Sequence, residues 1–127
     1  MKRIVPIFLF SLMLFSCGSG GAGRSAYKEI GMDEAIAIMN TETDYIILDV
    51  RRPDEYTEGH IKGAINVPNE SIGDSEIPEL PDKGQLILVY CRSGRRSKEA
   101  AKKLSKLGYT NIVEFGGILD WMGEIEK

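Results

Sequence analysis

The chain has 127 residues, of which 43% are hydrophobic and 28% charged, a composition that predicts one folded globular domain and excludes a largely disordered protein. The formal net charge of -3 gives no support to a nucleic-acid partner. A single histidine and two cysteines exclude a multi-histidine metal site.

The N-terminus has the pattern of a targeting segment. Lys2 and Arg3 precede an apolar run over residues 4–15, which is shorter than the roughly 20 residues of a membrane-spanning helix. The run ends in Leu14-Phe15-Ser16-Cys17, which resembles a bacterial lipobox. The resemblance implies a lipoprotein signal peptide over residues 1–16, removed just before Cys17, and a lipid on the Cys17 thiol.

A Gly/Ser-rich stretch follows this motif. We expect residues 17–25 to be the lipidated cysteine and a flexible tether, and residues 26–127 to be the folded domain. The protein would then be exported and held by its lipid on the periplasmic or extracellular face of a bacterial cell envelope. An ordinary secretory signal that is cut elsewhere is the alternative. With lipid on Cys17, Cys91 is the one free thiol, which favours a cysteine kept for chemistry.

The rest of the chain alternates between strand and helix patterns. Continuous apolar runs at 45–50 and 86–90 predict strands buried on both faces, and shorter strands are expected at 27–30, 64–67 and 112–115. Helices are expected at 32–40, 53–56, 97–107 and 118–122, with a loop and a turn of helix over 69–84 and a turn at 116–117. This alternation predicts an α/β fold with a mainly parallel sheet.

The segment Cys91-Arg92-Ser93-Gly94-Arg95-Arg96-Ser97 joins the most apolar predicted strand to a helix. Ligands of open α/β sheets bind beyond the carboxyl ends of the strands. A helix N-terminus at that place offers unpaired N–H groups and the positive end of the helix dipole. Gly94 permits backbone angles that turn successive N–H groups inward, as in an anion-binding nest.

Polar side chains in the same segment reinforce this prediction. Ser93 and Ser97 add hydroxyl donors, and Ser97 is also a candidate helix cap. Three cations lie within five residues, namely Arg92, Arg95 and Arg96. All these groups favour a thiolate and lower the pKa of Cys91, and they would also hold a dianion such as thiosulfate. A buried, inert cysteine at the end of a strand is the alternative.

Two motifs in this sequence are similar to those of the rhodanese family. The pattern Cys-x-x-Gly-x-Arg-Ser after an apolar strand resembles the active-site loop of rhodanese domains. A second signature consists of Leu48-Asp49-Val50-Arg51, then Glu55-Tyr56, then the residues from Gly59 to Pro68. The resemblance covers residues 27–125 in the expected order. It implies a single rhodanese-like domain whose central sheet has about five strands with helices on both faces.

The resemblance also implies a reaction. The Cys91 thiolate would attack the outer sulfur of a small anionic donor such as thiosulfate and become a persulfide, and cyanide or a thiol, including a protein thiol, would then take that sulfur. The loop amides with Arg92, Arg95 and Arg96 would stabilise the sulfite leaving group, and Arg96 matches the position that recurs in the family. The resemblance implies no metal or organic cofactor, and a monomer is the default expectation.

Asp49, Arg51 and His60 are further candidates. Asp49 and Arg51 lie at the end of the neighbouring strand, where they would form an ion pair that braces the active-site loop or take a direct part in catalysis. His60 is a candidate general base. A thiolate that is already formed needs no base, so packing or hydrogen bonding is the alternative interpretation of this histidine.

Other functions compete with sulfur transfer. Tyrosine-phosphatase-type and Cdc25-like enzymes also place a cysteine before an anion loop, but their arginine comes six positions later, where this chain has Ser97. Arsenate reduction would require further cysteines. A persulfide carrier or sensor that acts on one envelope protein stays open, because the sequence does not identify the acceptor. An inactive binding module is disfavoured by the presence of Cys91.

Overall fold

The computed structural model describes residues 27–127. The signal peptide expected over residues 1–16, the lipid site at Cys17 and the tether through residue 25 lie outside that range. Between residues 27 and 127, no helix is both long enough and apolar enough to cross a membrane.

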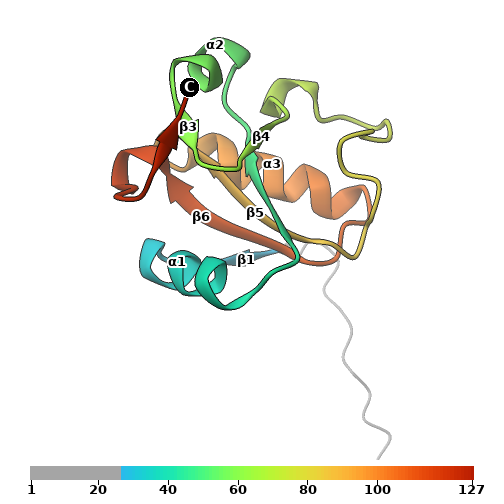
Figure 1. Cartoon of the computed structure of the whole chain (residues 1–127). Helices are drawn as coiled ribbons and strands as arrows, with labels where there is room; N and C mark the ends of the chain where they lie inside the picture. Colours follow the sequence, from blue (N-terminus) through green and yellow to red (C-terminus); the bar gives the residue numbers. More distant parts are fainter. Residues whose placement is uncertain (1–26) are drawn as a thin grey trace, which may run out of the picture.

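A five-stranded parallel sheet forms the centre of the molecule, with the strand order β1-β6-β5-β2-β4 (Figure 1). The strands are β1 (Lys28–Glu29), β2 (Tyr45–Asp49), β4 (Ile65–Asn66), β5 (Leu86–Cys91) and β6 (Ile112–Gly117). The helices are α1 (Met32–Thr41), α2 (Pro53–Glu58) and α3 (Arg95–Lys106), with single 3-10 turns η1 (Asn69–Ser71) and η2 (Ile118–Asp120). The predicted α/β fold with a mainly parallel sheet of about five strands is therefore confirmed.

The two faces of this sheet bury separate apolar cores. Successive side chains of a strand point to opposite faces, so Val89 packs on the face covered by α3 whereas Leu88 packs on the face covered by α1. Helix α3 contributes Ala100, Ala101 and Leu104 to the first core. Both central strands, β2 and β5, are covered on both sides, which explains why their sequences are apolar without alternation.

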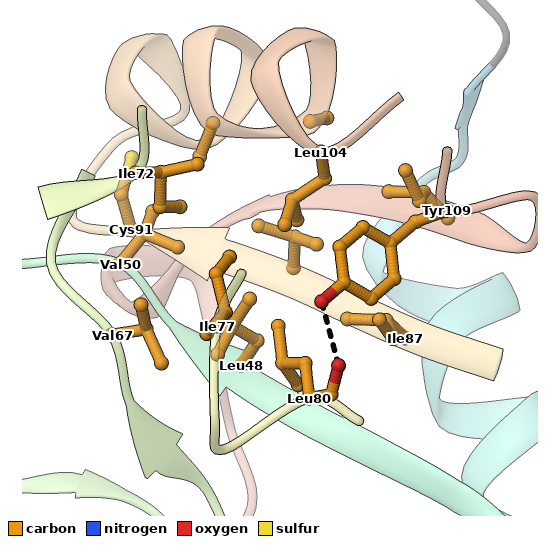
Figure 2. Close-up of a cluster of buried hydrophobic side chains, with 14 residues drawn as sticks. Leu48, Val50, Val67, Ile72, Ile77, Leu80, Ile87, Cys91, Leu104 and Tyr109 are labelled. Atoms are coloured by element: carbon orange, nitrogen blue, oxygen red, sulfur yellow. Dashed lines mark hydrogen bonds between the residues drawn. The ribbon is translucent and has the colours of Figure 1, made fainter. Parts of the chain in front are cut away.

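The long connection after β4 completes the first core. Its side chains Ile72, Ile77 and Leu80 are buried against the sheet, and the Leu80 carbonyl accepts a 2.6 Å hydrogen bond from the hydroxyl of buried Tyr109 (Figure 2). Cys91 belongs to the same cluster and lies at the end opposite Tyr109 in Figure 2. The cysteine side chain thus sits at the edge of a packed apolar core.

Several predicted boundaries differ from the structure. Helix α3 begins at Arg95 and Gly94 is its N-cap, with no side-chain cap; Ser97 lies inside the first turn and donates to the Gly94 carbonyl at 2.9 Å. The glycines at 116–117 belong to β6 and form no separate turn. The helix predicted at 118–122 is a single 3-10 turn.

A small antiparallel pair was absent from the sequence prediction. Strand β3 (His60–Ile61) pairs with β7 (Ile125–Glu126) near the C-terminus. Two-residue strands carry no periodic signal, so only the tertiary contact identifies them.

A buried ion pair joins the ends of β2 and β5. The Asp49 carboxylate, which is fully buried, accepts hydrogen bonds from the Arg51 guanidinium at 2.6 and 3.0 Å and from the Tyr90 hydroxyl at 2.7 Å. Arg51 also donates to the Gly59 carbonyl at 2.7 Å, and the Tyr90 hydroxyl accepts from the Ile61 amide at 3.1 Å. This network ties the segment around residues 59–61 to the two central strands.

We predict that Asp49→Asn lowers the free energy of unfolding by about 3–5 kcal/mol, because it leaves the Arg51 guanidinium buried without a counterion. Urea unfolding followed by circular dichroism measures the change. The matched control is Asp54→Asn, which breaks the exposed Arg52–Asp54 pair and should leave stability nearly unchanged. Equal effects of the two substitutions would contradict a structural role for the buried network.

Candidate active site

Cys91 is the last residue of β5 and lies between the ends of β2 and β6. Its side chain is 1% exposed. The register between β5 and β6 shifts just before Cys91, which pairs with Gly117. A Cβ atom on Gly117 would lie 2.0 Å from the Arg92 carbonyl oxygen, so only glycine lets β6 approach the residues after Cys91 so closely. The Leu119 amide then donates to the same Arg92 carbonyl at 3.2 Å.

The backbone turns sharply between Cys91 and α3. Gly94 has φ of 119°, a left-handed value that strains any residue with a side chain. This conformation aims the Gly94 N–H at the Cys91 sulfur, 3.0 Å away. The sulfur therefore lies at the N-terminus of a 12-residue helix, where unpaired amides and the helix dipole favour a negative charge.

The ionisation of Cys91 follows from two opposing effects. Burial acts to raise the pKa of the thiol, because a thiolate loses solvation in an apolar setting. Hydrogen bonds from the Ser97 side chain and from the amides of Ser97, Gly94 and Ser93 act in the other direction and together hold the pKa of Cys91 below its ordinary value. The geometry thus favours the thiolate, the reactive form of cysteine.

The three arginines of the loop have different surroundings. Arg92 and Arg95 are exposed, and Arg95 pairs with Glu99 at 3.2 Å. Arg96 is half-buried and forms a two-pronged ion pair with Glu55 of α2, at 2.6 and 3.1 Å. The Arg96 guanidinium holds the pKa of Glu55 at about 2, so Glu55 remains ionised and fixes the position of Arg96 at neutral pH.

A basic cavity of about 350 Å³ opens at the loop. It is lined by Arg52, Glu70, Arg92, Ser93, Arg95 and Arg96. Four cations against one carboxylate make the cavity suitable for an anion. The sequence predicts residues 92–97 as an anion loop. Each of these six residues either lines the cavity or donates a hydrogen bond to the Cys91 sulfur.

The other predicted residues, Asp49, Arg51 and His60, bond groups outside residues 91–97. The expected Asp49–Arg51 ion pair is present at 2.6 Å, but its partners are Tyr90, Gly59 and Asn66. His60 stacks on Tyr56 with ring centroids 3.8 Å apart and bonds the Tyr56 carbonyl through Nδ1 at 2.9 Å. These contacts are those of packing and hydrogen-bonding residues. No group of three or more potential metal ligands occurs within residues 27–127.

Four neighbours of the loop were not predicted as site residues. Arg52 and Glu70 line the cavity, and Glu55 binds Arg96 across 41 positions of sequence. The motif Glu55-Tyr56 was part of the family resemblance, but nothing local to it indicates the partner of its carboxylate. Buried Glu114 accepts a hydrogen bond from the Ser97 hydroxyl at 2.5 Å, whereas the sequence predicts it only as part of a strand.

Comparisons with known proteins agree on one family. Residues 31–124 match the model of the rhodanese-like domain. The chain is 40% identical over 73 residues to the thiosulfate sulfurtransferase PspE of Escherichia coli K12, covering 58% of this chain and 70% of that protein. It is also 30% identical over 103 residues to the putative sulfur carrier protein YrkF of Bacillus subtilis. That match covers 80% of this chain and 55% of the other protein.

A solved structure supports the same likeness. The structure of a rhodanese with anions from E. coli superposes with a TM-score of 0.60 at 36% identity, covering 65% of this chain and 98% of that one.

We predict that Gly94→Ala raises the pKa of Cys91, because a residue with a Cβ is strained at φ of 119° and its relaxation displaces the amide that bonds the sulfur. The full chain with Cys17→Ser, in which Cys91 is the only thiol, is alkylated with iodoacetamide across a pH series. The wild-type loop should react at pH values below the ordinary cysteine pKa of about 8.5, and Gly94→Ala should require higher pH.

Gly108→Ala is the matched control, since Gly108 has a similar φ of 100° at the far end of α3 with open space around its Cβ position. It should lower stability by a comparable amount and leave the alkylation profile unchanged. If both variants shift the pH dependence of alkylation equally, the pKa of Cys91 responds to a general loss of stability and not to the Gly94 amide.

Proposed function

The chain belongs to the family of rhodanese-like domains, and on that premise we propose that it is a sulfurtransferase that carries a sulfane sulfur on Cys91. The observation that carries this proposal is the hydrogen bond from the Gly94 amide to the Cys91 sulfur at 3.0 Å, at the N-terminus of α3. It supports a preformed thiolate nucleophile, and the residues that follow Cys91 line a basic cavity suited to an anion.

The first half-reaction starts from this thiolate. Cys91 attacks the outer sulfur of thiosulfate, a new S–S bond forms, and the bond between that sulfur and the sulfonate breaks with its electron pair on sulfite. Cys91 is left as an anionic persulfide. The dianionic donor and the sulfite both need positive surroundings, which the guanidinium groups of Arg92, Arg95 and Arg96 supply at the cavity wall.

The second half-reaction returns the enzyme to its starting state. A thiophilic acceptor such as cyanide or a thiolate attacks the outer sulfur of the persulfide, and the S–S bond breaks with its electron pair on the Cys91 sulfur. The amides that stabilise the thiolate before the reaction stabilise it again as the leaving group. The two half-reactions require no metal or organic cofactor.

The Glu55–Arg96 pair supports this reaction from α2. A long arginine side chain loses conformational freedom on binding an anion. Because Glu55 already holds Arg96 by two hydrogen bonds, part of this conformational entropy is lost on folding, before the donor binds.

A protein thiol as acceptor is favoured by one further observation. The exposed large apolar side chains of residues 27–127 are Leu119, Met122 and Ile125, all from the C-terminal segment. Leu119 hydrogen-bonds the Arg92 carbonyl through its amide, so the start of this apolar segment borders the basic loop. An acidic polypeptide segment that presents a cysteine beside apolar residues would complement both features. Persulfide transfer to such a partner is the second candidate function.

We also propose that the domain acts at the envelope of a bacterial cell, held by a lipid on Cys17. The segment Leu14-Phe15-Ser16-Cys17 supports this proposal. Growth with a radiolabelled fatty acid tests it, because the parent chain should then carry the label and Cys17→Ser should not, and equal labelling of the two would contradict it.

The experiment that tests the proposed function measures thiocyanate formed from thiosulfate and cyanide by the full chain with Cys17→Ser. Parallel double-reciprocal lines are expected, since donor and acceptor react in separate steps. Adding Cys91→Ser should abolish turnover. Thiocyanate formation that survives this substitution, or intersecting lines, would contradict the Cys91 persulfide.

The same preparation separates the two acceptors. After loading with thiosulfate, it is mixed with a cysteine peptide rich in Asp and Leu or with one rich in Lys and Leu. Faster discharge to the acidic peptide at low salt, slowed by Leu119→Ser with Met122→Ser while cyanide turnover is unchanged, supports a protein partner. Equal rates for both peptides favour small acceptors.

A further inference from the structure

The outer side of helix α3 carries a row of cations. A helix has about 3.6 residues per turn, so side chains three or four positions apart lie on the same side of it. In α3 the exposed residues at this spacing include Arg95, Lys98, Lys102 and Lys106, which we call the basic stripe. At a rise of about 1.5 Å per residue the stripe extends for about 17 Å. It lies on the side of α3 that faces away from the sheet (Figure 1).

This stripe lies on a domain that is acidic. Residues 27–127 hold all 19 Asp and Glu of the chain and 13 of its 16 Lys and Arg, because three of the basic residues precede residue 27. The formal charge of the domain is therefore 13 minus 19, or -6. Within α3, by contrast, Glu99 is the one acidic residue, and it pairs with Arg95 at 3.2 Å. An anionic partner is thus attracted to this face of the domain.

The charges of the stripe repel one another along the helix. Lys98, Lys102 and Lys106 are spaced by four residues, a distance at which like charges on a helix destabilise it. Lys98 lies 3.6 Å from the Glu114 carboxylate, whereas Lys102 has no ion-pair partner among residues 27–127. Only Lys106 gains from the helix dipole, because it lies in the last turn. Helix stability therefore does not explain Lys102, and carboxylates bound along the stripe would offset the repulsion.

The stripe connects two cavities. At its start, Arg95 lines the basic cavity beside the Cys91 loop. At its end, Lys106 lines a second cavity of about 460 Å³, whose walls include the apolar residues Ile72 and Leu107. A partner that lies along the stripe would therefore meet an anion site next to the nucleophile's loop at one end. At the other end it would meet a hollow that accepts an apolar side chain.

We propose that the basic stripe is the docking surface for an acidic protein that accepts the sulfur from Cys91. The proposal rests on the persulfide transfer to a protein thiol proposed above, and it names the surface that binds the acceptor. The partner has a helix with carboxylates at intervals of four residues and a cysteine near the end that reaches the basic cavity. Its thiolate attacks the outer sulfur of the Cys91 persulfide, a new S–S bond forms on the partner, and Cys91 leaves as a thiolate with the electron pair of the broken bond.

A membrane of anionic lipids is the other partner with the right charge. Because the stripe begins at the basic cavity, a flat membrane seated on the stripe would cover that cavity and exclude a small donor. A protein acceptor covers the cavity only while it presents its own thiol to the loop. The position of the stripe beside the cavity therefore favours the protein.

The first test measures binding alone, with the full chain carrying Cys17→Ser. The probe is a fluorescent peptide of about 20 residues that has Glu at every fourth position and Ser in place of its cysteine. Fluorescence anisotropy at low salt should show that Lys102→Glu weakens binding about tenfold, and about 0.5 M NaCl should remove the difference. This substitution places a carboxylate between Lys98 and Lys106, which favours the helix, so thermal unfolding should show no loss of stability.

Lys28→Glu is the matched control. It makes the same change of charge at an exposed position of β1, the strand at one edge of the sheet, and should leave the affinity for the peptide unchanged. Equal weakening by the two substitutions would overturn the proposal, because the overall charge of the domain and not the stripe would then attract the peptide. Equal affinity for a peptide with Gln in place of every Glu would overturn it as well.

The second test follows sulfur transfer to the same peptide with its cysteine restored. After loading with thiosulfate, the Lys102→Glu chain should discharge to the peptide about tenfold more slowly than its parent at low salt, while turnover with cyanide is unchanged. Unequal cyanide turnover would overturn the proposal, since the substitution would then disturb the site itself.

Vesicles of phosphatidylcholine, with and without phosphatidylglycerol, test the membrane as the partner. If Lys102→Glu abolishes binding that depends on phosphatidylglycerol but leaves peptide binding intact, the stripe binds lipid and the proposal is overturned. The binding test does not require a sulfur atom on Cys91. A chain that binds the acidic peptide through Lys102 but never acquires sulfur would therefore contradict the proposed function while retaining the docking surface.

Discussion

The hydrogen bond from the Gly94 amide to the buried Cys91 sulfur is the constraint on which the rest of the site depends. A thiolate inside an apolar core is unfavourable unless donors surround it. The left-handed Gly94 supplies the turn that aims the amide, and the absence of a side chain on Gly117 lets β6 close against the loop. Helix α3 starts immediately afterwards. Backbone donors of the fold thus favour the anionic form of this sulfur.

The arginines of the same loop differ in their contacts and therefore in their roles. Arg96 is held by Glu55 of α2, so a helix from a distant part of the sequence fixes one wall of the cavity. Arg92 and Arg95 are exposed and add positive potential where a donor or acceptor approaches. The exposed apolar segment that includes Leu119 borders this basic surface. The loop that follows the buried Cys91 thus presents a basic cavity with an apolar residue at its border.

The sequence predicts those elements whose pattern lies in residues close together in the chain. The apolar runs of β2 and β5, the helical spacing in α1 and α3, and the cysteine loop all follow from residues close together in the chain. Ser97 was misjudged as a helix cap because Gly94 takes that place. The β3–β7 pair, the Glu55–Arg96 pair and the Glu114–Ser97 contact each join segments far apart in the sequence, and such contacts leave no mark on local periodicity.

The role proposed for Cys91 is to carry a sulfur atom. Its most direct test is the intact mass of the full chain with Cys17→Ser, measured before and after thiosulfate and again after cyanide. We expect a gain of the mass of one sulfur atom that cyanide removes and that Cys91→Ser never acquires. A folded protein with reduced Cys91 and an unchanged mass would contradict thiosulfate as the donor, and a gain retained by Cys91→Ser would contradict Cys91 as the carrier.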